Sequence, residues 1–113
     1  MVNLNLYPQI IQDLLTEIHT RDACGNKNGV ESQLIFDTQN HHYLLVDLGW
    51  EGKHFTYGTI IHIDIKDNKI WIQRNNTEIN LAESLVERGI DKNNIVIGLH
   101  SPFMRQFSGY AIN

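Results

Sequence analysis

The sequence has little that would mark a secreted, membrane-embedded or disulfide-stabilised protein. Its single cysteine, Cys24, cannot form an internal disulfide, which fits a reducing compartment. No apolar run approaches the roughly 20 residues that a membrane-spanning helix requires. The first residues lack the basic and then apolar pattern of a secretory signal peptide. These absences predict a cytoplasmic protein without a membrane anchor.

Positive charge is also scarce. Nine lysine and arginine residues stand against thirteen aspartate and glutamate residues, which gives a net charge of −4. Affinity for nucleic acid comes mainly from clustered basic side chains, so the composition argues against tight DNA binding by this chain alone. It leaves open a subunit that reaches DNA through a partner. With 113 residues and ordinary hydrophobic content, we expect one domain over residues 1–113.

A β-hairpin over Tyr57–Gln73 is the most strongly patterned part of the chain. Asp67 and Asn68 tolerate the positive φ of a tight turn, and aliphatic residues alternate with other residues on both sides of them. The predicted register pairs Lys66 with Lys69, Ile65 with Ile70, Asp64 with Trp71, Ile63 with Ile72, and His62 with Gln73. This register gathers two groups on opposite faces: Ile63, Ile65, Ile70 and Ile72, and His62, Asp64, Trp71 and Gln73.

Further elements are expected on the N-terminal side of this hairpin. Apolar residues three and four apart predict an amphipathic helix from Leu6 to about Thr20, with Asn5 as its N-cap. Two strands are expected over Val30–Asp37 and Tyr43–Trp50, joined by a short hairpin connection. A Gly- and Asn-rich loop over 21–29 links the helix to the first of these strands. Together with the central hairpin, the strands form an antiparallel meander.

Three elements are expected after the hairpin. Asn80 and Glu83 have the spacing of a capping box, and Gly89 suits the position after the end of a short helix. An apolar run predicts a fifth strand over Ile95–Leu99. The tail Phe103–Asn113 is apolar enough to pack against the rest of the molecule. We therefore predict an α+β fold: an N-terminal helix, a four-stranded antiparallel meander, a second short helix, a fifth strand and a packed apolar tail.

Six histidines raise the question of a metal site. His62 and Asp64 lie on one strand face, ~7 Å apart from the strand rise. A metal ion would need a third ligand, and His100 or Asp47 would supply it only if the fold brings one of them close. The alternative is a solvated polar face, which the absence of a tightly spaced metal signature favours.

The other reactive side chains have no supporting pattern. His41, His42 and His54 fall in expected loops, where adjacency in sequence does not make a chelate. Cys24 has no base near it in sequence, so we interpret it as a loop thiol. We therefore predict no catalytic residue, no metal and no cofactor.

The triplet Asp64-Ile65-Lys66 matches the Asp-x-Lys element of some metal-dependent nucleases. Asp47 is the acidic candidate on the preceding strand, and carboxylates beside a lysine suit Mg²⁺-assisted hydrolysis. A pattern of three residues occurs by chance in many strands. An Mg²⁺-dependent nuclease using Asp47, Asp64 and Lys66 is therefore an alternative hypothesis, and a direct DNA-binding accessory factor is another.

Trp71 is a large aromatic residue among polar neighbours, and such residues often anchor protein contacts. The alternative is that the tail or the second helix covers it. Beyond the fifth strand, Pro102 stiffens the chain and Arg105 offers a planar guanidinium group. We hypothesise a partner-binding surface formed by His62, Asp64, Trp71, Gln73, His100, Pro102 and Arg105. The competing interpretation makes Trp71 and Arg105 internal, tying the tail to the sheet.

Seven stretches that cover almost the whole chain match one family. They are 7–16 (YPQIIQDLLT), 30–38 (VESQLIFDT), 42–50 (HYLLVDLGW), 61–73 (IHIDIKDNKIWIQ), 77–79 (TEI), 85–102 (LVERGIDKNNIVIGLHSP) and 105–112 (RQFSGYAI). The hairpin and the Gly-Leu-His-Ser-Pro stretch at 98–102 are the specific parts. On these residues the chain resembles the XisI family, the controlling factors for excision of the fdxN element in nitrogen-fixing, heterocyst-forming bacteria.

The resemblance implies a small cytoplasmic α+β protein that acts beside a companion, XisH, and a site-specific recombinase, XisF. It implies that the excision chemistry belongs to the recombinase, and it supplies no catalytic residues to transfer. We therefore expect a non-enzymatic regulatory or accessory protein that works through an XisH-like companion and an XisF-like recombinase. Because Trp71 and the apolar tail leave surface to bury, we also expect a homo-oligomer, most simply a twofold dimer.

Overall fold

The structure, a computed structural model, describes residues 6–22 and 29–113. Its elements are α1 (Tyr7–Asp22), β1 (Val30–Asp37), β2 (His42–Glu51), β3 (His54–Lys66), β4 (Lys69–Asn75), α2 (Leu81–Glu87), the 3₁₀ helix η4 (Lys92–Asn94), β5 (Ile95–Val96) and α3 (Pro102–Arg105). The predicted α+β class is confirmed. The proposed cap Asn5, the thiol of Cys24 and most of the 21–29 loop lie outside the described residues.

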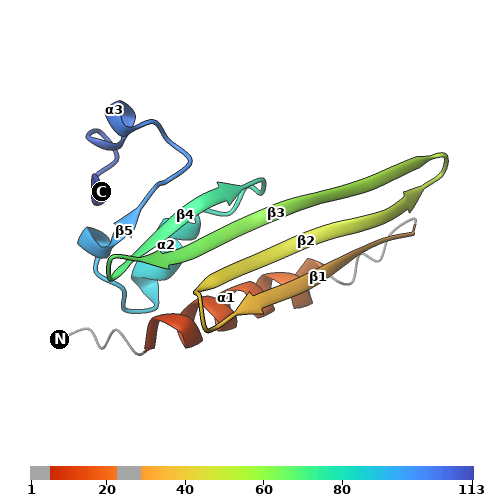
Figure 1. Ribbon diagram of the computed structural model, residues 1–113, viewed down its shortest axis with the longest axis horizontal. Coiled ribbons are helices and arrows are strands. Elements are labelled where there is room, and N and C mark those ends of the chain that lie inside the picture. Colours follow the sequence, from red (N-terminus) through yellow and green to blue (C-terminus); the bar gives the residue numbers. More distant parts are fainter. Residues whose placement is uncertain (1–5, 23–28) are drawn as a thin grey trace.

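One mixed sheet organises the molecule, with strand order β1-β2-β3-β4-β5 (Figure 1). The first four strands form the predicted antiparallel meander. The fifth strand joins the edge parallel to β4, because α2 and η4 carry the chain back before it pairs. Beyond this edge the C-terminal segment adds a parallel bridge between Val96 and Ala111.

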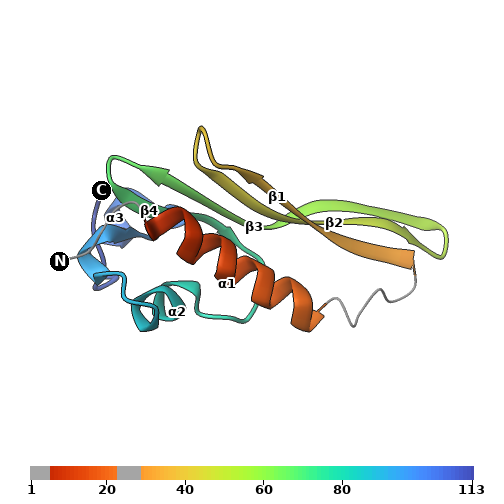
Figure 2. The same cartoon turned by 90° about the horizontal axis from the view of Figure 1, so that it is seen from below.

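The helices α1 and α2 lie on one face of the sheet (Figure 2). The apolar stripe of α1 packs there, and the buried core combines Tyr7, Ile11, Leu14, Leu15 and Ile18 with Tyr43, Leu45, Ile61, Ile63, Ile70, Ile72, Leu81, Ala82, Leu85, Ile90 and Ile95. Asn80 caps α2 as predicted, because its side-chain oxygen accepts a hydrogen bond from the Glu83 amide. Gly89 follows with a φ of +100°, which suits glycine.

The central hairpin has the predicted turn and four of the five predicted pairs. Asp67 and Asn68 adopt φ values of 55° and 63°, as a tight turn between twisted strands requires. The pairs from Lys66–Lys69 to Ile63–Ile72 are confirmed. The fifth pair is wrong: a β-bulge between His62 and Ile63 places His62 opposite Arg74. Gln73 is the extra residue, and its side chain hydrogen-bonds Asp64 instead.

The hairpin of β2 and β3 is longer than predicted and extends past the end of α1 (Figure 1). The third strand already begins at His54, and a second bulge between Leu45 and Val46 bends the pair. At the far end the rings of Trp50 and Phe55 pack with centroids 5.1 Å apart. Both side chains remain exposed, so this arm contributes little to the helix-covered core.

The C-terminal part differs most from the prediction. The fifth strand has two residues and not five, because the chain turns at Gly98 and Leu99 and the Leu99 amide bonds to the Ile72 carbonyl. The tail does return to the sheet, where Tyr110 packs against the core and Ala111 donates to Ile95. Its other large apolar residues, however, are more than half exposed: Phe103, Met104, Phe107 and Ile112.

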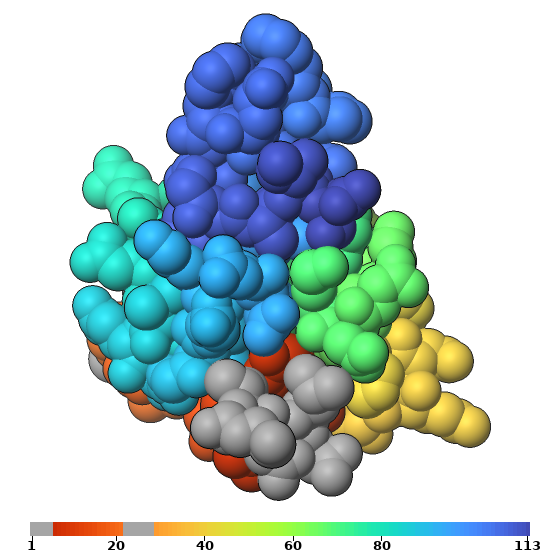
Figure 3. Space-filling view, turned by 90° about the vertical axis from the view of Figure 1, so that its left-hand side faces the viewer, coloured from red at the N-terminus to blue at the C-terminus, as the bar shows by residue number. Residues whose placement is uncertain are grey.

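This exposed part of the tail stands out from the body as a separate projection (Figure 3). Its helix α3 has a single turn, with Pro102 at its start and the Ser101 hydroxyl accepting from the Met104 amide. One turn is too short to lay an apolar face along the sheet, which explains why the predicted packing is incomplete. Along residues 6–22 and 29–113, no helix is long and apolar enough to cross a membrane.

Candidate functional site

A compact polar cluster occupies the sheet face opposite α1 and α2. It consists of His42, His62 and Asp64, and we call it the His–Asp cluster. His42 begins β2 and pairs directly with Asp64 on β3, while His62 precedes Asp64 by two residues and shares its face. His42 Nδ1 lies 2.8 Å from Asp64 Oδ1, and His62 Nε2 lies 2.7 Å from the same oxygen.

Asp64 is the centre of this cluster. Its side chain is 16% exposed, and Gln73 Nε2 donates to its second oxygen, Oδ2, over 3.3 Å. Burial acts to raise the pKa of Asp64, but the hydrogen bonds from His42 and His62, the charge of His62 and the Gln73 amide together lower it. The hydrogen bond between His42 and Asp64 also raises the pKa of His42. Asp64 is therefore an ionised acceptor held between two imidazoles.

The cluster supplies three potential metal ligands. Its ligand atoms all lie within 4.8 Å of one another, and no second group of this kind occurs among residues 6–22 and 29–113. Two imidazoles and one carboxylate are a set that zinc and ferrous iron bind in proteins. Without an ion, the same geometry is a hydrogen-bonded triad that ties β2 to β3.

Two members of this cluster, His62 and Asp64, were predicted from the sequence to share a strand face, whereas His42 was not. The prediction of a loop at His42 is wrong, because β2 begins at this residue and His42 pairs with Asp64 on β3. Carrying the pairing of β2 and β3 back to the first residue of β2 would have revealed this contact. The two suggested third ligands do not reach the cluster: His100 follows β5, and Asp47 lies elsewhere on β2.

The proposed nuclease residues are not brought together. Asp47 pairs with Gly58, which is six residues from Asp64 along β3, or ~20 Å at the usual strand rise. By strand alternation Asp47 also faces the α1 side, next to Ser32, whose hydroxyl contacts His19 of that helix. Lys66 shares the face of Asp64, but its ammonium lies 4.4 Å from the centre of the Trp71 ring.

Trp71 is covered, which is the second of the two alternatives raised by its position. Its side chain is 8% exposed, with Lys66 over the ring and the Arg105 guanidinium 5.3 Å from its centre. Arg105 also donates to the carbonyls of His100 and Gly98. The planar guanidinium group of Arg105 therefore binds backbone oxygens and joins the tail to the sheet.

The residues of the hypothesised partner surface thus divide into three groups. His62, Asp64 and Gln73 belong to the His–Asp cluster and its support. Trp71 and Arg105 form the stacked pair beneath the tail. His100 and Pro102 lie on the exposed segment that leads into α3. The parallel pairing of Trp71 with Val96 brings the hairpin next to β5, as this surface requires.

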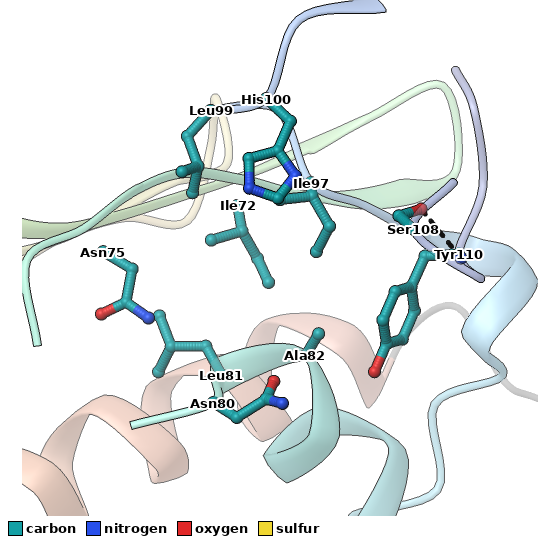
Figure 4. Close-up of a pocket in the computed structure, with 10 residues that line it drawn as sticks. All are labelled: Ile72, Asn75, Asn80, Leu81, Ala82, Ile97, Leu99, His100, Ser108 and Tyr110. Atoms are coloured by element: carbon teal, nitrogen blue, oxygen red, sulfur yellow. Dashed lines mark hydrogen bonds between the residues drawn. The ribbon is translucent and has the colours of Figure 1, made fainter. Parts of the chain in front are cut away.

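A pocket of about 340 Å³ lies between β4, α2 and the tail (Figure 4). Five of its lining residues are aliphatic, and the others are Asn75, Asn80, His100, Ser108 and Tyr110. The two asparagine side chains already make hydrogen bonds within the chain, since Asn75 donates to the Ile79 carbonyl and Asn80 caps α2. Asp64 and His62 are not among the lining residues, so the pocket and the His–Asp cluster are separate features.

Comparisons with known proteins match the whole chain. The XisI protein family model covers residues 1–112. A crystal structure of a XisI-like protein from Anabaena variabilis ATCC 29413 is 40% identical, with a TM-score of 0.91 over 98% of this chain and 100% of that one. The fdxN element excision controlling factor XisI from the same organism is 29% identical, with a TM-score of 0.83 over 97% and 98%. No curated protein matches. The chain belongs to the XisI family.

Proposed function

We propose that this chain is a non-enzymatic accessory protein of the excision-controlling type, acting in the cytoplasm through contacts with other proteins. Family membership supports this class, since a solved relative is described as the fdxN element excision controlling factor. The observation that carries the protein-contact role is the exposure of large apolar side chains at two separate places. The net charge of −4 favours protein partners over DNA.

The first exposed place is the far end of the β2–β3 hairpin, which we call the arm surface. It is formed by Trp50, Phe55 and Tyr57, of which Tyr57 is 73% exposed. Trp50 pairs with Phe55 across the strands, and Tyr57 pairs with Leu48, so all three side chains share one face. An exposed aromatic surface on a protruding hairpin suits a second copy of the chain, which would bury the same residues on both sides.

The second place is the exposed part of the tail, which we call the tail surface. Phe103 and Phe107 pack edge to face with centroids 5.5 Å apart, and Met104 lies between them in sequence. The stacked pair of Trp71 and Arg105 holds this segment against the sheet from below. The tail surface therefore continues the hypothesised surface at His100 and Pro102, and we assign it to an XisH-like companion.

A binding experiment tests this assignment. The chain is co-expressed with the XisH-like protein of its own genome, and the complex is isolated through a tag on the companion. We expect co-purification, and we expect the double substitution Phe103→Ser and Phe107→Ser to abolish it. The matched control is Phe55→Ser with Tyr57→Ser on the arm surface, which should leave companion binding unchanged. Loss of binding in the control alone would show that the companion binds the arm surface and not the tail surface.

The alternatives are tested with the same preparation. A nuclease would cleave DNA with Mg²⁺ and lose this activity on Asp64→Ala, but the separation of Asp47 from Asp64 gives no support for it. A direct DNA-binding factor would form a submicromolar, sequence-specific complex at physiological salt, where non-specific binding reaches only ~10⁻⁴–10⁻⁶ M. Either result would contradict the proposed role as a non-enzymatic accessory protein that acts through protein contacts. Addition of an XisF-like recombinase then tests whether the complex of chain and companion also recruits it.

A further inference from the structure

We propose that the His–Asp cluster binds one divalent transition-metal ion of the zinc type. The ligand atoms are His42 Nδ1, His62 Nε2 and Asp64 Oδ1. Both nitrogens already point at the same carboxylate oxygen, from 2.8 and 2.7 Å. In a tetrahedral site with bonds of ~2.0–2.1 Å, ligand atoms stand ~3.3 Å apart. Each nitrogen–oxygen distance therefore needs to lengthen by only about half an ångström, and the two nitrogens, which lie within 4.8 Å of each other, need to take up the same tetrahedral spacing.

The sheet pre-positions these ligands. His42 and Asp64 are 22 residues apart in sequence but directly opposite each other on β2 and β3. His62 shares their face because strand side chains alternate with a period of two. The ladder of β2 and β3 holds all three backbones whether or not an ion is bound, so binding costs little ordering of the chain. This distinguishes the cluster from histidines that meet by chance on a loop.

A neighbouring side chain, Gln73, supports the Asp64 carboxylate in the way seen in protein metal sites. Ligating carboxylates are commonly hydrogen-bonded through their second oxygen, which orients the first toward the ion. Here the Gln73 amide donates to Asp64 Oδ2, leaving Oδ1 toward the histidines. The amide of Gln73 is itself packed, because a Cβ at Gly98 would lie 2.5 Å from Gln73 Oε1. The bulge that displaced Gln73 from pairing with His62 thus gives this residue a function.

The ligand set selects the class of ion. Magnesium and calcium prefer sites made of oxygen atoms, whereas two imidazoles favour zinc, iron and related first-row ions. The side chains of His42 and His62 are 53% and 35% exposed, so an ion would be reached directly from solvent. Three protein ligands leave at least one position for water or for a side chain of a partner. Binding of the ion requires this chain alone and not the proposed companion.

Direct titration tests the proposal. Tag-free protein carrying Cys24→Ser, which removes the competing thiol, is stripped with a chelator and titrated with Co²⁺ and Zn²⁺. We expect one ion per chain, with the visible absorption of Co²⁺ bound to nitrogen and oxygen ligands. His42→Gln and Asp64→Asn should each weaken binding by at least about tenfold. The matched control His54→Gln removes an exposed histidine at the other end of β3 and should change nothing.

Thermal melts keep the test valid if a variant is less stable. Zn²⁺ should raise the melting temperature of the Cys24→Ser protein and of its His54→Gln derivative, but not that of His42→Gln. His42 is more than half exposed, so its replacement should leave the fold intact. Absence of saturable binding below about 100 µM, or equal affinity in His42→Gln and His54→Gln, would show that the cluster is a hydrogen-bonded triad without a metal role.

Discussion

His42 Nδ1 lies 2.8 Å from Asp64 Oδ1, although 22 residues separate the two in sequence. The contact exists because β2 begins at His42 and because β2 and β3 pair without interruption from this residue to Leu45. A shift of one residue in that pairing would turn the two side chains to opposite faces. The aliphatic face of the same strands, buried under α1, therefore fixes the geometry of the polar face.

Replacement of Ile63 tests that buried face. Ile63 is fully buried in the core under α1, so Ile63→Ala should reduce the free energy of unfolding by about 2–5 kcal/mol. Urea denaturation at neutral pH measures the change. The matched control is Ile35→Ala on β1, where the side chain is almost half exposed and the loss should be much smaller. Equal effects in the two variants would contradict the assignment of the faces.

The hairpin shows how far sequence reasoning reaches. Asp67 and Asn68 tolerate positive φ, and this local property set a register in which four pairs were predicted correctly. The bulge at His62 could not be predicted, because it depends on the hydrogen bond from Gln73 to Asp64 and on the approach of Gly98. These contacts join segments that periodicity treats separately.

The same limit explains the errors in the site and the tail. Alternation located His62 and Asp64, but the start of β2 at His42 follows from pairing with β3, which no pattern around His42 indicates. Part of the cover over Trp71 comes from Arg105, more than thirty residues away. The run Ile95–Leu99 has the composition of a strand, yet it leaves the sheet after Val96. Long-range packing decided each of these cases.

Arg105 should hold the tail more than it supports the core. Its guanidinium bonds the carbonyls of His100 and Gly98 and stacks over Trp71. Arg105→Lys keeps the charge but loses the planar fork, so amides of residues 98–111 should exchange hydrogen faster while the core is unchanged. Arg88→Lys, which alters the contact with Glu17 between the helices, is the control. Uniform exchange changes in both variants would argue against a local role.

The ion pair of Glu17 and Arg88 predicts a pH dependence. The Arg88 hydrogen bond and charge lower the pKa of Glu17 in the folded state. A lowered folded pKa contributes stability above the unfolded pKa, and this contribution disappears as pH falls through the folded pKa. Glu17→Gln should therefore be less stable than the parent protein at pH 7 and lose that difference in acid. Glu78→Gln provides an exposed control, and a Glu17→Gln deficit that persists at low pH would contradict the assignment.

The arm surface predicts self-association. Trp50, Phe55 and Tyr57 expose aromatic rings on one face of a protruding hairpin, and burying them against a second copy removes apolar area from water. Light scattering should report a dimer at tens of micromolar, and Trp50→Ser with Tyr57→Ser should shift it to the monomer. Phe103→Ser with Phe107→Ser is the matched control and should remain dimeric. A monomeric parent protein would remove this interface from the proposal.

Replacement of Gln73 tests whether the hydrogen bond to Asp64 supports the proposed metal site. Its amide contacts Asp64 Oδ2 and none of the three ligand atoms. Gln73→Ala should therefore leave all three ligands in place but weaken Zn²⁺ binding by about tenfold, because the carboxylate loses its orientation. Arg74→Ala is the control: its side chain bonds the Thr59 carbonyl on the neighbouring strand. Calorimetric titration gives the affinities, and melts without metal show whether folding is retained. If Gln73→Ala and Arg74→Ala both bind Zn²⁺ as tightly as the parent protein, the hydrogen bond from Gln73 does not support the ion. Gln73 is then only the extra residue of the β-bulge.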